Sequence, residues 1–511
     1  MATVETPPAV ETTPEHLDVL IVGAGISGVD AGYRLQETVP DKSYAILEAR
    51  GEIGGTWDLF RYPGIRSDSD MFTLGFPFRP WTSDRAIVDG TSIREYVQAT
   101  AREYGIDTKI RFHHRMIGAN WSTAEERWTV EVERTDTGQR TQLTCGFLLM
   151  CSGYYRYDQG YTPDFPGTEE FRGQIVHPQF WGQDIDYAGK RAVVIGSGAT
   201  AVTLVPALAE KAEHVTMLQR SPSYILSLPG NDSIASLARR FLSPQRAFGL
   251  TRWTHVLGAT ILFQVSRRRP EWVKKLLRRG VERQLPPGYD VETHFTPSYA
   301  PWDQRMCFVP DGDLFDAIRA GKASVVTDQI DRFTETGIRL ASGGELKADL
   351  VVTATGLILQ PLGGAQLRID GREVDLPSTL IYRGCMFSDI PNFAMSFGYT
   401  NASWTLKADL TCQFAARLVR HMADNGYAYC VPRNNDPSME TAPFVDFSSG
   451  YFLRSLDQLP KQGTKQPWRL NQNYFIDSLK LKRAPLEDGV LQFVPAGVSA
   501  PAAGEPVSAA A

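Results

Sequence analysis

Two segments of the chain share one pattern, in which a short apolar run meets a glycine-rich turn and a stretch with helical spacing follows. The first apolar run covers residues 18–22 and the second covers residues 191–195. Runs this short and apolar are typical of buried parallel strands. The pattern therefore predicts an α/β fold with two interleaved Rossmann-like dinucleotide-binding domains.

The first glycine turn has the spacing of a dinucleotide-binding motif. Gly23, Gly25 and Gly28 allow a tight turn, the approach of a pyrophosphate, and close packing of the helix on the strand. Ser27 lies at the predicted start of the helix, where amide groups and the helix dipole attract phosphate. The next predicted strand, SYAILE, ends in Glu48, which is placed to accept hydrogen bonds from a ribose.

The second glycine turn differs from the first at the end of the strand that follows it. This strand, HVTMLQRS, ends in Arg220 rather than in an acid. A carboxylate here would repel a 2′-phosphate, whereas an arginine can pair with it, so we predict NADPH. The contacts expected from this turn and strand are Gly196, Ser197, Gly198, Ala199, Thr200, Ala201, Arg220 and Ser221.

Two dinucleotide sites in one chain, one with a ribose acid and one with an arginine, predict a flavoprotein that holds FAD and takes hydride from NADPH. Disulfide reductases carry a redox cysteine pair in a GGTC stretch after the ribose acid. The corresponding stretch here, residues 54–57, reads GGTW and holds no cysteine. Dioxygen is therefore the expected acceptor of the flavin's electrons.

The composition narrows the class of protein. A chain of 511 residues with 42% hydrophobic and 22% charged residues is expected to form two or three folded domains. The net charge of -5 gives no case for nucleic-acid binding, and the histidines lack the spacing of a metal site. Six scattered cysteines without a CxxC pair, together with an N-terminus unlike a signal peptide, predict a cytoplasmic protein.

The basic charge is concentrated in one segment. Residues 235–285 contain 12 Lys and Arg residues against two Glu residues, and their apolar positions have helical spacing. We therefore expect a basic helical insertion at residues 229–296. Three interpretations remain open: a helical subdomain that shapes the substrate cleft, a solvated basic face without a partner, or peripheral contact with an anionic membrane through residues 235–285.

Two motifs resemble the signatures of class B flavin monooxygenases, specifically the Baeyer-Villiger monooxygenases. They are GGTWDLFRYPGIRSD at residues 54–68 and FRGQIVHPQFW at residues 171–181. The second motif of the family includes one more position after Trp181, and Gly182 departs from the family's residue there. The resemblance extends over residues 17–473 and weakens in the basic insertion. The positions that match the second fingerprint are Phe171, Gly173, His177 and Trp181.

The resemblance implies an enzyme that uses FAD, NADPH and dioxygen to oxidise ketones to esters or lactones through a flavin peroxide. Sulfoxidation is the expected side activity, so the substrate would be a small ketone or sulfide. Two alternatives remain. One is an N- or S-oxygenating flavin monooxygenase, against which Trp181 and Arg305 argue, and the other is an NADPH oxidase that releases hydrogen peroxide.

The resemblance also implies roles for individual residues. Arg305 takes the place of the family's catalytic arginine, a fixed cation that stabilises negative charge during oxygen transfer, and Asp68 that of the aspartate that orients it. Gln304 stands where the family usually has a lysine, so Arg220 is expected to carry more of the preference for NADPH. His177 is expected to position the domains. The other implied contacts are Gly55, Thr56, Trp57, Asp68 and Met116 for FAD, and Arg66, Ser67, Asp68 and Trp404 for NADPH.

The motifs also predict where the chain divides. The expected parts are disordered tails at residues 1–16 and 495–511, an FAD-binding domain at residues 17–153 plus 385–494, an NADPH-binding domain at residues 154–228 plus 297–384, and the insertion at residues 229–296.

Overall fold

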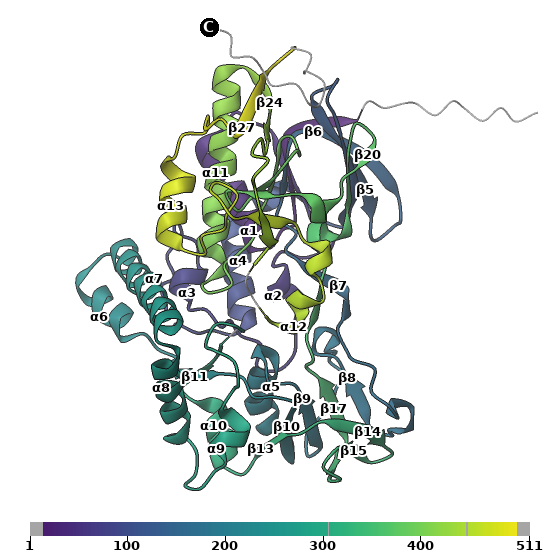
Figure 1. Ribbon diagram of the computed structural model, residues 1–511, viewed down its shortest axis with the longest axis vertical. Helices are drawn as coiled ribbons and strands as arrows, with labels where there is room; N and C mark the ends of the chain where they lie inside the picture. The colour runs from purple at the N-terminus through teal and green to yellow at the C-terminus, as the bar shows by residue number, and fades with distance from the viewer. Residues whose placement is uncertain (1–13, 305, 446–447, 498–511) are drawn as a thin grey trace, which may run out of the picture.

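The chain folds around two separate sheets, one above the other in Figure 1. The computed structural model describes residues 14–304, 306–445 and 448–497. The larger sheet has the order β20-β19-β4-β5-β6-β1-β2-β3, and β23 also pairs with β6. Its strands are β1 (Glu15–Val22), β2 (Tyr44–Leu47), β3 (Ile110–Arg111), β4 (His114–Ser122), β5 (Arg127–Arg134), β6 (Arg140–Met150), β19 (Gln366–Ile369), β20 (Arg372–Glu373) and β23 (Phe393–Met395).

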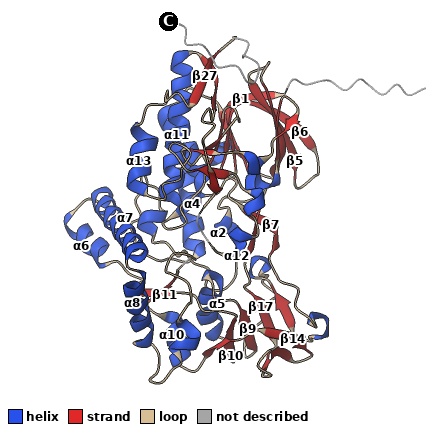
Figure 2. Ribbon diagram, viewed as in Figure 1, coloured by secondary structure: helices blue, strands red, loops and turns tan. Residues whose placement is uncertain are grey.

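The larger sheet is apolar on both faces, as its central parallel strands require. Val19 and Ile21 of β1 pack with helices α1 (Ile26–Thr38), α4 (Gly90–Glu103) and α11 (Trp404–Asn425) on one face. Leu20 and Val22, which alternate with them, belong to a second cluster on the opposite face together with the buried Trp128. Figures 1 and 2 show α1, α4 and α11 gathered beside this sheet.

The smaller sheet is wholly parallel and has the order β13-β10-β9-β17-β8. Helices α5 (Ala199–Ala209) and α10 (Asp313–Arg319) pack on one face, and Phe333 and Ile338 of a hairpin pack on the other. Both sheets thus confirm the predicted pair of Rossmann-like α/β units. The strands are β8 (Gln174–Val176), β9 (Arg191–Ile195), β10 (His214–Gln219), β13 (Ala323–Thr327) and β17 (Leu350–Thr353), and the hairpin strands are β14 (Ile330–Thr334) and β15 (Gly337–Leu340).

After forming the smaller sheet, the chain returns to the larger sheet earlier than we predicted. Two linking strands, β7 (Tyr155–Gly160) and β18 (Leu357–Leu359), pair with each other between the sheets. Directly after them β19 pairs in parallel with β4 of the larger sheet, and Leu367, Leu376 and Ile381 are buried in its core. The expected boundary at residue 384/385 is therefore wrong, and we propose one near residue 360.

The basic segment forms four helices, which lie between the parallel strands β11 (Ile225–Leu228) and β12 (Cys307–Pro310). Helices α6 and α7 project from the side of the molecule (Figure 1), whereas α9 packs in the core of the smaller sheet. No helix of the described residues is long and apolar enough to cross a membrane. The helices are α6 (Ser233–Phe241), α7 (Pro244–Arg268), α8 (Pro270–Glu282) and α9 (Val291–Phe295).

Two side chains of α7 fasten this segment to the short helix α3 (Met71–Leu74), which directly follows the YPGIRSD motif. The buried guanidinium of Arg252 donates through Nη1 to the carbonyl oxygens of Phe72 at 2.7 Å and Gly75 at 2.8 Å. One turn further on, the His255 ring lies between two carboxylates, with Nδ1 3.2 Å from Asp70 and Nε2 2.5 Å from Asp232. The insertion is thus held against the segment that follows Asp68.

The contact of His255 predicts a pH-dependent stability. Burial alone would lower the pKa of His255, but Asp70 and Asp232 raise it to about 9. A raised pKa stabilises the fold fully below the unfolded value of about 6.5, and the effect is lost as pH rises through about 9. We expect His255→Gln to lower the free energy of unfolding by about 2–3 kcal/mol at pH 6 and by much less at pH 10. Urea unfolding at both pH values measures this, and an equal loss at both would contradict the account.

Candidate functional site

One large cavity lies between the two sheets and opens onto both glycine turns. Its volume is about 1370 Å³, whereas pockets for one small ligand usually measure about 300–1,000 Å³. Its wall includes Gly25, Glu48 and Trp57 from the first unit and Gly198 and Arg220 from the second. The cavity is therefore large enough to take two dinucleotides.

The first glycine turn is shaped by close main-chain contacts. Gly23 has a φ of +105°, and a Cβ there would lie 2.6 Å from the carbonyl oxygen of Cys151. A Cβ on Gly28 would lie 1.8 Å from the carbonyl oxygen of Gly23. Gly28 is thus buried behind the cavity wall, while Gly23, Gly25 and Ser27 lie on the wall. Helix α1 begins after Gly25 without a side-chain cap, so its first amide groups suit an anionic pyrophosphate.

Glu48 directly follows β2 at the edge of this turn and is buried. Its Oε2 accepts a hydrogen bond from the amide of Ala24 at 2.8 Å, and its Oε1 accepts one from the amide of Arg50 at 2.9 Å. Burial raises the pKa of the Glu48 carboxyl, and the two amides oppose this effect. Met116 of β4 lines the same end of the cavity. The carboxylate is held rigidly, with its remaining lone pairs available to a ribose.

The second glycine turn repeats this arrangement. A Cβ on Gly196 would lie 2.4 Å from the carbonyl oxygen of Ala354, and α5 begins after Gly198 without a side-chain cap. The Ser197 hydroxyl donates to the carbonyl oxygen of Ser221 at 2.9 Å. Ala199 and Thr200 line the cavity, and Arg220 and Ser221 lie exposed at its rim. Ala201 is fully buried in the helix packing, as Gly28 is in the first turn.

The YPGIRSD loop connects the two units. Phe60 and Tyr62 are buried in the core of the smaller sheet, although they follow the first glycine motif in the chain. A Cβ on Gly64 would lie 2.4 Å from the carbonyl oxygen of Thr203 on α5. Arg66 forms an ion pair with Asp313 of α10 through both of its terminal nitrogens. The loop therefore holds the cavity wall at the junction of the two sheets.

Asp68 is half-buried on the cavity wall, at the end of this loop. The neighbouring Ser67 is buried, and its hydroxyl accepts a hydrogen bond from the amide of Ser69 at 2.9 Å. Gln304 lies on the wall as well, whereas Arg305 lies outside the described residues. The structure thus brings Asp68 and the residue before Arg305 into one cavity.

The GGTW stretch and the start of α11 complete the wall near α1. Gly55 lies against Gly25, since a Cβ on Gly55 would be 3.0 Å from the Gly25 Cα. Thr56 and Trp57, in the short helix α2 (Thr56–Leu59), line the cavity. Trp404 begins α11, and its indole Nε1 donates to the Ser27 hydroxyl at 2.8 Å. The starts of α1 and α11 therefore meet at the cavity.

His177 lies between the two linking strands rather than on the cavity wall. Its Nε2 is 3.0 Å from the carbonyl oxygen of Gly356, and its Nδ1 accepts a hydrogen bond from the amide of Gln179. A Cβ on Gly160 would overlap the ring at 2.1 Å. Burial lowers the pKa of His177, which favours the neutral ring that these contacts require. The arrangement supports a positioning role at the joint between the units.

Several residues at the cavity escaped the sequence prediction. Tyr157 of β7 lies beside Thr56, and burial raises the pKa of its phenol to about 12. The guanidinium carbon of Arg454 lies 3.5 Å from the ring centre of Tyr161. The C-terminal part of the chain meets the link between the units here. None of these three residues belongs to a motif, so spacing carried no signal for them.

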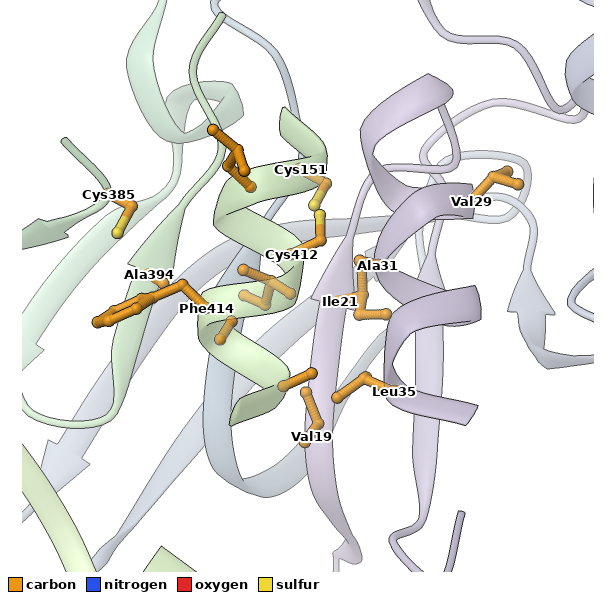
Figure 3. Packing of buried hydrophobic residues seen from close by; sticks show 14 of the residues in the cluster. Val19, Ile21, Val29, Ala31, Leu35, Cys151, Cys385, Ala394, Cys412 and Phe414 are labelled. Carbon is orange, nitrogen blue, oxygen red and sulfur yellow. The ribbon is translucent and has the colours of Figure 1, made fainter. Parts of the chain in front are cut away.

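Two cysteines also meet beside the first glycine turn. The sulfurs of Cys151 and Cys412 point toward each other in Figure 3, and both residues are free thiols. The hydrogen bond to Cys151, together with burial, raises the pKa of the Cys412 thiol well above its ordinary value. The Cys412 thiol also contacts the Ser27 carbonyl oxygen at 3.6 Å. The Cys412 thiol is therefore protonated, and both cysteines are packed beneath the turn. Among the described residues, no group of three or more His, Cys, Asp and Glu side chains could hold a metal ion.

Comparisons with known proteins show which proteins this chain is similar to. It matches the flavin-binding monooxygenase-like family over residues 70–247 and an NAD(P)-binding Rossmann-like domain over residues 21–84. It is 58% identical over 480 residues to the FAD-containing monooxygenase EthA of Mycobacterium tuberculosis, covering 94% of this chain and 98% of the relative. It is 55% identical over 480 residues to EthA of Mycolicibacterium smegmatis, covering 94% of this chain and 97% of the relative.

Solved structures share the fold at lower identity. An oxidised steroid monooxygenase bound to NADP superposes with a TM-score of 0.71 at 21% identity, over 94% of this chain and 100% of that chain. OTEMO in complex with FAD and NADP superposes with a TM-score of 0.67 at 20% identity, over 82% of this chain and 88% of that chain.

Proposed function

The chain belongs to the flavin-binding, FAD-containing monooxygenases, and we propose that within this family it is a Baeyer-Villiger monooxygenase. As a member of the family it is an NADPH-dependent flavin monooxygenase. The proposed reaction converts a small ketone to an ester or lactone, with oxidation of sulfides as a side activity.

The observation that carries this proposal is the shared cavity of the two glycine turns. The uncapped starts of α1 and α5 both face it, so each can hold one pyrophosphate. The GGTW stretch in its wall contains no cysteine that could accept electrons. Trp181 and Arg305, which the resemblance associates with ketone oxidation, favour this reaction over N- or S-oxygenation.

Bound FAD would supply the redox chemistry, by accepting hydride from NADPH and activating dioxygen. The chain supplies binding, orientation and charge. Glu48 would accept hydrogen bonds from the FAD ribose, and Arg220 would pair with the 2′-phosphate of NADPH. The guanidinium of Arg305 would stabilise negative charge that develops on the carbonyl oxygen of the ketone, and it remains charged at working pH. Asp68 would orient this guanidinium.

Product analysis under air separates the three functions considered. With NADPH and a linear or aryl ketone, the proposal predicts an ester as the main product. Oxidation of amines or sulfides without any ester would favour an N- or S-oxygenating enzyme. NADPH consumption that yields only hydrogen peroxide would identify an oxidase.

Arg220 is expected to decide which nicotinamide cofactor is used. Since Gln304 replaces the usual lysine, Arg220→Ala removes the main cation at the 2′-phosphate site. We expect the ratio of kcat/KM for NADPH over NADH to fall about 100-fold, mostly through the KM for NADPH. Arg140→Ala, which removes an exposed arginine outside the cavity, is the control. An unchanged ratio in Arg220→Ala would contradict the assignment.

A further inference from the structure

The basic insertion exposes an unusual amount of apolar surface. Of the 15 large hydrophobic side chains that are exposed among the described residues, ten lie between Ile234 and Leu276. Scattered exposed hydrophobic residues are normal in soluble proteins, but a contiguous group marks a surface for a partner or a membrane.

The exposed residues follow one side of each helix. On α6 they are Ile234, Leu237 and Phe241, at spacings of three and four, and Phe241 is 79% exposed. On α8 they are Trp272 and Leu276, one turn apart. Each helix packs on the protein mainly through other residues, although the half-exposed Trp253 ring of α7 also contacts Tyr474 and Phe475. We call the exposed side of α6, α7 and α8 the insertion face.

Helix α7 carries the longest apolar stripe of the insertion face. Leu250, Trp253, Leu257 and Ile261 recur every three or four residues, and each is about half exposed. Val256, on the inner side of the same helix, packs with Tyr399, which lines the cavity. The helix that carries the stripe therefore packs directly against the wall of the proposed active site.

Basic side chains accompany this apolar surface. Residues 233–282 contain only two acids, Glu271 and Glu282, which already pair with Lys274 and Arg278. Several other basic residues are exposed and have no ion pair within the described part of the chain. They include Arg240, Arg246, Arg268, Lys275, Arg279 and Arg283.

By helical spacing, the unpaired charges lie beside the apolar positions. Arg246 precedes Leu250 by one turn and Arg268 continues the α7 stripe, while Lys275 and Arg279 lie three residues from Trp272 and Leu276, respectively. Helices with apolar side chains flanked by basic ones are typical of proteins that lie in the membrane interface.

We propose that the insertion face binds the surface of an anionic lipid bilayer. The apolar side chains enter the boundary between headgroups and acyl chains, and the unpaired basic residues contact lipid phosphates. A second copy of the chain is a poorer occupant, because a symmetric contact would place the same basic residues against each other. If the face had no partner, the apolar side chains of α7 would stay exposed to water, which is unfavourable for a contiguous group.

Sedimentation with lipid vesicles tests this proposal without using enzyme activity. The FAD-loaded full chain is mixed at low salt with vesicles of phosphatidylglycerol and phosphatidylcholine, or of phosphatidylcholine alone. We expect binding to the mixed vesicles only, weakened by salt. Phe241→Ser with Leu237→Ser should reduce partitioning roughly tenfold, as should the triple change Lys275→Gln, Arg279→Gln and Arg283→Gln.

Matched controls carry the same changes elsewhere. Ile175→Ser with Phe180→Ser removes exposed apolar side chains outside the insertion, and Lys211→Gln, Lys322→Gln and Arg372→Gln together remove three exposed charges. Neither control should alter vesicle binding. The proposal would be overturned by absence of binding at low salt, or by equal losses in variants and controls. A lipid-independent dimer that Phe241→Ser dissociates would overturn it in favour of a second copy.

Discussion

Gly28→Ala is expected to abolish tight FAD binding. The added Cβ would lie 1.8 Å from the carbonyl oxygen of Gly23, so the turn that faces the pyrophosphate must open. We expect FAD affinity to fall at least about 100-fold, which corresponds to about 3 kcal/mol. Flavin absorbance of the purified protein and titration with added FAD measure the effect.

Two further variants separate loss of the site from loss of the fold. Gly25→Ala adds a Cβ whose nearest contact is the Gly55 Cα at 3.5 Å, so the protein accommodates it while the approach of the pyrophosphate is blocked. We expect this variant to fold and still lose FAD. Gly258→Ala, where a Cβ on α7 meets nothing within 4 Å, should retain FAD. Full FAD occupancy in both Gly25→Ala and Gly28→Ala would show that FAD does not bind at this turn.

Arg305→Ala is expected to uncouple NADPH oxidation from ester formation. Gln304 and Cys307, on either side of this position, line the cavity, and removal of one group that stabilises developing charge typically costs about 10²–10³ in rate. We expect flavin reduction by NADPH to continue, ester formation to fall about 1000-fold, and hydrogen peroxide to appear instead. Stopped-flow flavin absorbance and product analysis measure the two half-reactions separately.

Arg220→Ala serves as the comparison for this result. It should weaken NADPH binding yet leave the yield of ester per NADPH consumed unchanged. Ester formation that survives in Arg305→Ala would remove Arg305 from the mechanism.

The parts of the fold that local sequence specifies could be predicted. The apolar runs of β1 and β9, the glycine turns and the helices after them need only neighbouring residues, because a parallel strand followed by a tight turn has a local signature. The same holds for Glu48, whose position at the end of β2 follows from strand spacing. Helical spacing likewise predicted helices in the basic insertion.

Contacts between distant segments could not be predicted in this way. The pairing of β19 with β4 joins residues about 250 positions apart and depends on which sheet edge lies open. The ion pair of Arg66 with Asp313 and the meeting of Cys151 with Cys412 likewise arise from packing between units. A motif locates a residue on a loop, but not the partner that another part of the chain brings to it.

Isotopic labelling of the product tests the central claim most directly. The FAD-loaded enzyme is given NADPH, an aryl ketone and ¹⁸O₂, and the ester is examined by mass spectrometry. The account predicts one labelled oxygen in the ester and one ester formed for each NADPH consumed. NADPH consumption with labelled hydrogen peroxide and no labelled ester would contradict it.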